Sequence, residues 1–310
     1  MIPDTNAPFD GVYVATVCPM RPDFAIDEDA LAAHLQDAMA TPGMRGVLIN
    51  GHAGENFMLS REEKRRVVAI AHATIGDRAV IVSGLNAEGS LEAQRHAADA
   101  RDAGADALMV FPPFSWALSQ DADMAVTHHR MIAEAAPGPL MLYQAGVRAG
   151  TMAYTHDALA RLVQIPGVVG IKEGSWEAAA YEANRRLVKA VAPQVSVMAS
   201  GDEHLLTCFV VGSEGSLVSL AVLVPDAIVG LERAVLAGDL ERARGHHSVI
   251  QPLARAIYGT APGGLATARL KCCLKMVGKL RHDVMRPPIG PLPDHEVAML
   301  RSALTTAGLL

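Results

Sequence analysis

Short apolar runs recur along the whole chain, and each run is continuous rather than alternating with polar residues. Continuous apolar runs of this length are typical of parallel strands that are buried on both faces. The pattern therefore predicts a set of buried parallel strands. The predicted strands are the segments 11–17, 45–50, 79–85, 106–112, 139–145, 168–174, 195–201 and 215–221.

Between these runs, apolar residues recur with the 3.6-residue period of amphipathic helices, for example at 27–40 and 90–104. The helix expected after the second strand begins with a clear start signal. Ser60 and Glu63 have the spacing of a capping box, and Leu59 is placed to act as a hydrophobic staple. Strand and helix are thus expected to alternate eight times.

Eight strand–helix units within residues 1–238, with no stretch that resembles an interdomain linker, predict one closed (β/α)8 TIM barrel of the α/β class. Residues 239–310 show only helical periodicity, so we expect a helical extension that packs on the barrel or on a neighbouring subunit. A doubly wound fold would need a Gly-rich turn after the first strand. The segment 17–23 (VCPMRPD) has no such turn, which disfavours that alternative.

Composition and charge limit the classes of function that fit this chain. Half of the residues are hydrophobic, and the net charge of −6 argues against a partner held by nucleic-acid phosphates. The four cysteines (Cys18, Cys208, Cys272 and Cys273) form no C-x-x-C pair, which suggests reduced thiols in a cytoplasmic protein and no zinc site. Residues 1–11 do not resemble a signal peptide, and the longest apolar run, 217–225, is too short to cross a membrane.

Lys172 is the leading candidate for chemistry, because the active site of such a barrel lies where the strands end. It stands at the end of the sixth predicted strand, on the same face as Gly170, while Ile171 faces the helices. Loss of hydration there favours the neutral amine, a nucleophile that forms Schiff bases with ketones. The alternative is a structural lysine that reaches solvent or pairs with Glu173.

Two further candidates follow the fifth predicted strand. Tyr143 ends that strand, so it can lie beside Lys172 and move protons there; an ordinary half-buried tyrosine is the alternative. Arg148 lies in a loop flanked by glycines, and its guanidinium suits a substrate carboxylate, although a surface arginine fits equally well.

The turn 50–56 (NGHAGEN) follows the second predicted strand. Its glycines allow the backbone N–H groups around His52 and Ala53 to face a small anion such as a carboxylate. A tight turn without a ligand remains the alternative.

Together these segments resemble the dihydrodipicolinate synthase / N-acetylneuraminate lyase (DapA-like) family of class I aldolases and dehydratases. GHAGEN at 51–56 is similar to the family's G-T-T-G-E turn, and YQAGVRAG at 143–150 to its Y-N-x-P-x-R-x-G segment. VVGIKEGS at 168–175 is similar to the strand with the Schiff-base lysine, and SGDE at 200–203 to its S-G-D-D turn. The segment 286–309 follows the family's closing pattern.

The resemblance implies an oligomeric barrel, a dimer or more usually a homotetramer, that needs no metal or organic cofactor. It implies that Lys172 attacks the ketone of pyruvate or a related 2-oxo acid, that Tyr143 moves protons, and that the backbone around His52 and Ala53 holds the carboxylate. His52 is itself a further candidate for catalysis. An aldehyde or a sugar acid would be the co-substrate. The substrate-binding residues implied are Ala53, Gly54, Arg148, Gly201, Phe114 and Leu217.

The chain departs from the family pattern in the synthase's Thr-Tyr-Tyr proton relay. His52 stands at the first position, and Pro113 and Phe114 stand where the tyrosine pair is expected. Phe114 has no hydroxyl, so that relay cannot operate in its usual form. His52 can titrate near neutral pH and could replace the threonine, or it could only shape the pocket. Phe114 and Trp116 suggest a more apolar, aromatic second substrate.

Three hypotheses follow. The first is a Schiff-base lyase, aldolase or dehydratase that acts on a 2-oxo acid through Lys172. The second is a true 4-hydroxy-tetrahydrodipicolinate synthase, using pyruvate and aspartate semialdehyde, with an altered relay. The third is a non-catalytic barrel that binds a small acid.

Overall fold

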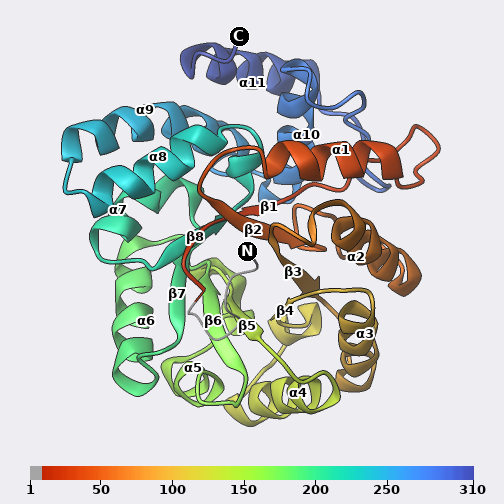
Figure 1. Ribbon diagram of the computed structural model, residues 1–310, viewed down its shortest axis with the longest axis vertical. Coiled ribbons are helices and arrows are strands. Elements are labelled where there is room, and N and C mark those ends of the chain that lie inside the picture. Colours follow the sequence, from red (N-terminus) through yellow and green to blue (C-terminus); the bar gives the residue numbers. More distant parts are fainter. Residues whose placement is uncertain (1–8) are drawn as a thin grey trace.

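Eight parallel strands form a closed barrel in the computed structural model, which describes residues 9–310 (Figure 1). Each strand pairs with its neighbours in the chain, and the first pairs with the last. This confirms the predicted TIM barrel. The strands are β1 (Gly11–Ala15), β2 (Met44–Ile49), β3 (Val80–Leu85), β4 (Ala107–Val110), β5 (Leu140–Gln144), β6 (Val168–Glu173), β7 (Ser196–Ala199) and β8 (Gly215–Val218).

Helices follow the strands and form a ring around the barrel, as Figure 1 shows. They are α1 (Glu28–Ala38), α2 (Arg61–Ile75), α3 (Ser90–Asp102), α4 (Ala122–Ala135), α5 (His156–Leu162), α6 (Ala178–Val191), α7 (Leu205–Val210) and α8 (Pro225–Leu236). Short 3-10 turns lie between several strands and helices, namely η1 (Phe114–Ala117), η2 (Val147–Met152), η3 (Asp202–His204) and η4 (Ser219–Val222).

The C-terminal extension consists of α9 (Leu240–Ile257), η5 (Gly263–Leu265), α10 (Ala266–Met276) and α11 (Asp294–Thr306). It lies along one side of the ring, beyond α1 and α8 in Figure 1. Lys279 forms an ion pair with Asp37 of α1, and α9 packs against α8. The predicted boundary at 238/239 falls in the turn between α8 and α9, and the division into separate units stays a prediction.

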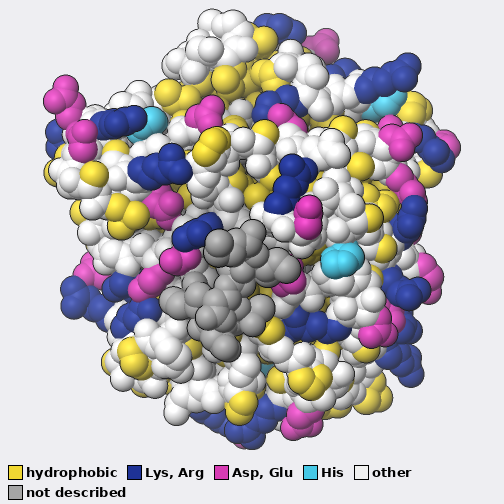
Figure 2. Space-filling view, in the orientation of Figure 1, with side chains coloured by type: hydrophobic (Ala, Val, Ile, Leu, Met, Phe, Trp, Pro, Cys, Tyr) yellow, Lys and Arg dark blue, Asp and Glu magenta, His cyan; other side chains and the backbone are white. Residues whose placement is uncertain are grey.

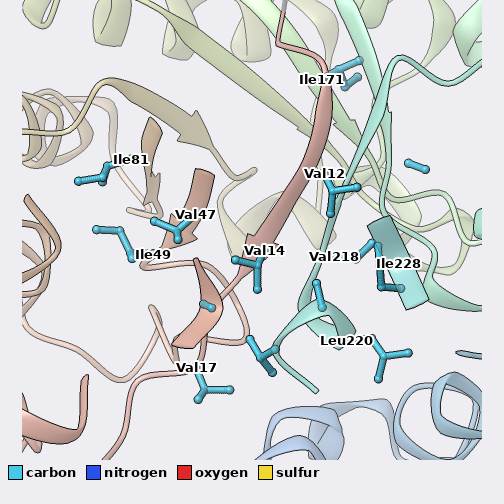
Figure 3. Close-up of a cluster of buried hydrophobic side chains, with 14 of the residues drawn as sticks. Val12, Val14, Val17, Val47, Ile49, Ile81, Ile171, Val218, Leu220 and Ile228 are labelled. Carbon is cyan, nitrogen blue, oxygen red and sulfur yellow. The ribbon is translucent and has the colours of Figure 1, made fainter. Parts of the chain in front are cut away.

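Two apolar layers explain why the strands have no alternating pattern. Val12, Val14, Val47, Ile49 and Ile171 belong to the layer between strands and helices (Figure 3). Their neighbours along the strands face the barrel interior, among them Tyr13, Leu48, Met141, Met198 and Leu217. Both faces of each strand are buried, so both parities of residue must be apolar.

The predicted capping box at the start of α2 is confirmed. The Ser60 side chain accepts from the Glu63 N–H, and the Glu63 carboxylate accepts from the Ser60 N–H at 2.9 Å. These bonds satisfy N–H groups that the first turn of a helix leaves without partners. They fix where the turn after β2 ends.

Charged side chains of both signs are interspersed over the face in Figure 2, without a large patch of one sign. Among the helices of residues 9–310, none has both the length and the apolar composition needed to span a bilayer. The expectation about a signal peptide concerns residues 1–11, of which 1–8 lie outside the described part.

Candidate active site

A cavity of about 380 Å³ lies where the barrel strands end. Residues at or just after the ends of β1, β2, β5, β6, β7 and β8 line it, together with residues of the extension. This is the end of the barrel at which such folds carry their chemistry. The lining residues are Ala15, His52, Ala53, Phe57, Phe114, Tyr143, Lys172, Trp176, Ser200, Asp202, Ser219, Tyr258, Gly263, Gly264, Ala266, Thr267 and Leu270.

Lys172 reaches this cavity from β6, and its side chain is half-buried. Ile171 packs against the helices, as expected, so Lys172 and Gly170 share the inner face. A Cβ on Gly170 would come within 3.2 Å of the Met141 side chain. Because residue 170 is a glycine, the Met141 side chain can fill the barrel interior below Lys172.

The pKa of Lys172 is lowered to about 8, mainly because burial disfavours the ammonium. The Asp202 carboxyl opposes this shift by stabilising the charged form. A substantial fraction of the amine is therefore neutral near physiological pH, as nucleophilic attack on a ketone requires.

Tyr143 is the direct cross-strand partner of Lys172 in the β5–β6 pair. The Lys172 Nζ lies 5.8 Å from the centre of the Tyr143 ring. Burial, with a smaller contribution from Glu173, raises the pKa of the phenol to about 12, so it stays protonated as a donor. A Cβ on Gly174 would lie 3.3 Å from the Tyr143 hydroxyl, so the absence of a side chain at 174 gives the phenol its place.

His52 lies between aromatic rings in the turn after β2. Its ring centre is 4.4 Å from that of Phe111, and the Tyr143 ring meets it edge-on at 5.4 Å. Burial, and then the nearby Lys172, lower the pKa of His52 to about 4. The imidazole is therefore uncharged at neutral pH, and it does not titrate there as the sequence suggested.

The turn around Ala53 has the features of a small anion site. Hydrogen bonds from the Glu55 N–H to the His52 carbonyl and from the Asn56 N–H to the Gly51 carbonyl shape it. Within residues 9–310, the N–H groups of Ala53 and Gly54 have no acceptor. Ala53 lines the cavity, and free backbone N–H groups of this kind can donate hydrogen bonds to a carboxylate.

Asp202, Ser219 and Tyr258 form a polar part of the cavity that was not predicted from the sequence. Asp202 is buried and accepts from the Leu220 N–H at 3.1 Å. Burial raises its pKa to about 7, against the effects of that hydrogen bond and of Lys172. The Ser219 and Tyr258 hydroxyls are hydrogen-bonded at 2.6 Å, and burial keeps the pKa of Tyr258 well above its usual value.

The other predicted site residues lie at different depths. Phe114, in η1, lines the cavity and is 43 % exposed. Gly201 lies between the lining residues Ser200 and Asp202, and Leu217 is fully buried in the barrel interior rather than at the cavity wall. The structure does not bring Arg148 into the lining: it lies exposed in η2.

Comparison with known proteins shows to which family the chain belongs. The family model described as "Dihydrodipicolinate synthetase family" matches residues 8–307. A 4-hydroxy-tetrahydrodipicolinate synthase of Methanothrix thermoacetophila is 32% identical over 300 residues, covering 96% of each chain. The chain belongs to the dihydrodipicolinate synthetase family.

Two further relatives agree with this assignment. An uncharacterized DapA-like lyase of Halobacterium salinarum is 29% identical, over 97% of this chain and 94% of its own. The pyruvate complex of a chloride-inhibited dihydrodipicolinate synthase from Acinetobacter baumannii is 26% identical, with a TM-score of 0.86 over 97% of this chain and 99% of that one. Membership of the dihydrodipicolinate synthetase family makes this chain an enzyme of the class I lyase type, which works through a lysine Schiff base.

Proposed function

We propose that this enzyme joins pyruvate, or a related 2-oxo acid, to an aldehyde, or catalyses the reverse cleavage, through a Schiff base on Lys172. The position of Lys172 carries the proposal: its amine lies in a partly dry cavity, next to a protonated phenol and opposite a turn with free N–H groups. The family's members named as synthases and the pyruvate complex of a relative support the choice of 2-oxo acid.

In the first step, the neutral Lys172 amine attacks C2 of the 2-oxo acid and forms a carbinolamine. The carboxylate of that acid would lie against the N–H groups of Ala53 and Gly54. Loss of water then gives an iminium ion, for which Tyr143 is placed to donate a proton to the departing oxygen and to take it back.

In the second step, C3 of the iminium loses a proton and becomes an enamine. The enamine forms a carbon–carbon bond to the aldehyde carbon, and the aldehyde oxygen takes up a proton. Water then hydrolyses the iminium, which releases a 4-hydroxy-2-oxo acid and restores the amine. The same steps in reverse describe cleavage.

Borohydride reduction in the presence of pyruvate tests the proposal directly. We expect one stable adduct on the peptide that contains Lys172, and none in Lys172→Ala. Lys189→Met is the control, because Lys189 lies on α6 and pairs with Glu214 away from the cavity. A folded wild-type protein that no 2-oxo acid labels would contradict the proposal.

Synthesis of 4-hydroxy-tetrahydrodipicolinate itself is the narrower alternative, supported by the names of several relatives. The neutral His52 and the hydroxyl-free Phe114 at the cavity weaken it, because they replace two members of the usual relay. A coupled assay with pyruvate and aspartate semialdehyde decides between the two.

We also propose that the enzyme acts as a homo-oligomer, a dimer or tetramer, in the cytoplasm. Phe114 and Leu118, in and just after η1, and Val147, in the adjoining η2, are exposed apolar side chains, and apolar groups gathered on one surface favour association. All four cysteines are free and buried, which suits a reducing compartment. Sedimentation analysis of the purified protein tests the assembly.

A further inference from the structure

We propose that the co-substrate of this site is an uncharged aldehyde with an aromatic or otherwise apolar body. This inference rests on the proposed function and adds the class of the second substrate. It is carried by two features of the cavity: an aromatic wall at its mouth and the distribution of charge around it.

The aromatic wall consists of Phe57, Phe114 and His52. The Phe57 and Phe114 rings meet edge-on with centres 6.2 Å apart, and the Phe114 ring is stacked with the His52 ring at 6.2 Å. The two phenylalanines are 40% and 43% exposed, so both retain apolar area that a ligand can cover. Trp176, another lining residue, adds a fourth ring, 5.7 Å from that of Tyr258.

The imidazole of His52 contributes apolar surface rather than charge, because its pKa lies well below neutrality. An aromatic ring placed among these side chains would gain both burial and ring–ring contacts, worth about 0.5–1.5 kcal/mol per pair beyond the area buried. The cavity, at about 380 Å³, falls in the usual size range of sites for small organic ligands.

The charges around the cavity disfavour a second carboxylate on the substrate. Among the described residues that line the cavity, Lys172 is the sole cation, and the 2-oxo acid uses it covalently. Asp202 is the sole acid in that lining, and in its ionised form it repels a further negative charge. A carboxylate carried by the aldehyde would lose its hydration without gaining an ionic partner, which is costly.

Arg148 is the competing ligand for such a carboxylate. Its side chain is exposed in η2, outside the lining, and no hydrogen bond or ion pair within residues 9–310 holds it toward the cavity. The residues that line the cavity therefore favour an uncharged aldehyde as the co-substrate. The product with an aromatic aldehyde would be a 4-aryl-4-hydroxy-2-oxo acid, formed with no oxidant or reductant.

Matched aldehyde pairs test this inference with the whole enzyme and pyruvate. The pairs are benzaldehyde with 4-carboxybenzaldehyde, and butanal with succinic semialdehyde, and the product is followed by mass spectrometry. We expect kcat/KM to be higher for the uncharged member of each pair by at least about tenfold, and highest for benzaldehyde. Equal rates, or faster reaction of the acids, would overturn the proposal.

A variant pair tests the aromatic wall. Phe114→Ala is expected to lower kcat/KM for benzaldehyde by about tenfold while pyruvate still labels Lys172. Phe24→Ala, which removes a similarly exposed ring outside this cavity, is the control and should change neither. Reaction of 4-carboxybenzaldehyde that is fast in the wild type and slow in Arg148→Gln would overturn the proposal in favour of Arg148.

Pyruvate labelling separates failure of this inference from failure of the proposed function. If borohydride traps pyruvate on Lys172 but the uncharged aldehydes are not preferred, only the inference on the co-substrate is wrong. If nothing is trapped, the Schiff-base function itself is wrong.

Discussion

Tyr143 and Lys172 are direct partners across the β5–β6 pair, and the Lys172 Nζ lies 5.8 Å from the centre of the Tyr143 ring. The backbone register of two buried strands therefore fixes the phenol beside the amine. The phenol does not depend on a loop for its position, which suits its proposed role as proton donor to the oxygen that leaves the carbon bound to Lys172.

Replacing Tyr143 by phenylalanine should remove the proposed proton donor while keeping the packing of the ring. We expect kcat to fall by about 10²–10⁴-fold, the usual contribution of a positioned acid or base, with little change in thermal stability. Steady-state kinetics and a melting curve check this. Tyr181→Phe is the control, because its hydroxyl binds the Val197 carbonyl on the outer side of the barrel. Equal losses in both variants would contradict the role of Tyr143.

The rate of borohydride trapping should depend on pH through Lys172. The neutral amine is the reactive form, so the rate should rise as pH increases through about 8 and level off above it. The Asp202 carboxylate stabilises the ammonium and raises the pKa of Lys172 against the effect of burial. Asp202→Asn should therefore move the midpoint to lower pH.

Glu203→Gln is the matched control for this pH shift, since Glu203 lies next to Asp202 in the chain but outside the cavity lining. Its midpoint should stay with the wild type. A midpoint that moves to higher pH in Asp202→Asn would show that the carboxyl does not stabilise the ammonium.

The barrel could be predicted from the sequence because its determinants are local. The apolar runs around Val12, Val47 and Ile171 are continuous because the strands that contain them are buried on both faces. The positions of Lys172 and Tyr143 at the cavity could be predicted in the same way, because both end strands and the active sites of such barrels lie at that end. The capping box of Ser60 is likewise complete within four residues.

Tyr258 could not be predicted, because its position depends on how the extension docks against the barrel. It directly follows α9, and its hydroxyl is hydrogen-bonded to Ser219, which lies 39 residues earlier in the chain. A contact between residues so far apart in sequence leaves no local sequence pattern. Asp202 could have been found: it lies in the SGDE segment directly after β7, where the rule of strand ends applies. The pKa of His52 depends on the rings packed around it, which the sequence does not place.

A methyl group on Gly174 should displace the Tyr143 phenol, the proposed proton donor. A Cβ there would lie 2.8 Å from the Gln144 carbonyl oxygen and 3.2 Å from Cε2 of Tyr143, so the strand end or the ring must move. We expect Gly174→Ala to lower kcat by about 10²-fold, as small misplacements of catalytic groups do. Gly245→Ala, on an open face of α9, should leave kcat unchanged. Full activity of Gly174→Ala would contradict the proposed placement of Tyr143.

The ion pair between Glu55 and Lys271 should hold the turn after β2, which is proposed to bind the substrate carboxylate, to the extension. Both side chains are fully buried, and Lys271 also donates to the Val284 carbonyl at 2.9 Å. Among residues 9–310, Lys271→Met would leave the buried Glu55 carboxylate with the Arg286 N–H as its one remaining hydrogen-bond partner. We expect a loss of about 3–5 kcal/mol in the free energy of unfolding, measured with urea, and a higher KM for pyruvate because the turn that carries Ala53 loosens.

Two variants show whether the charge pair itself is responsible. Lys275→Met, one turn further along α10, breaks an exposed pair with Asp283 and should cost no more than about 1 kcal/mol. The double variant Glu55→Gln with Lys271→Met removes both buried charges, so it should recover much of the stability lost in Lys271→Met. A Lys271→Met protein as stable as Lys275→Met, with an unchanged KM for pyruvate, would show that the turn keeps its shape without the extension.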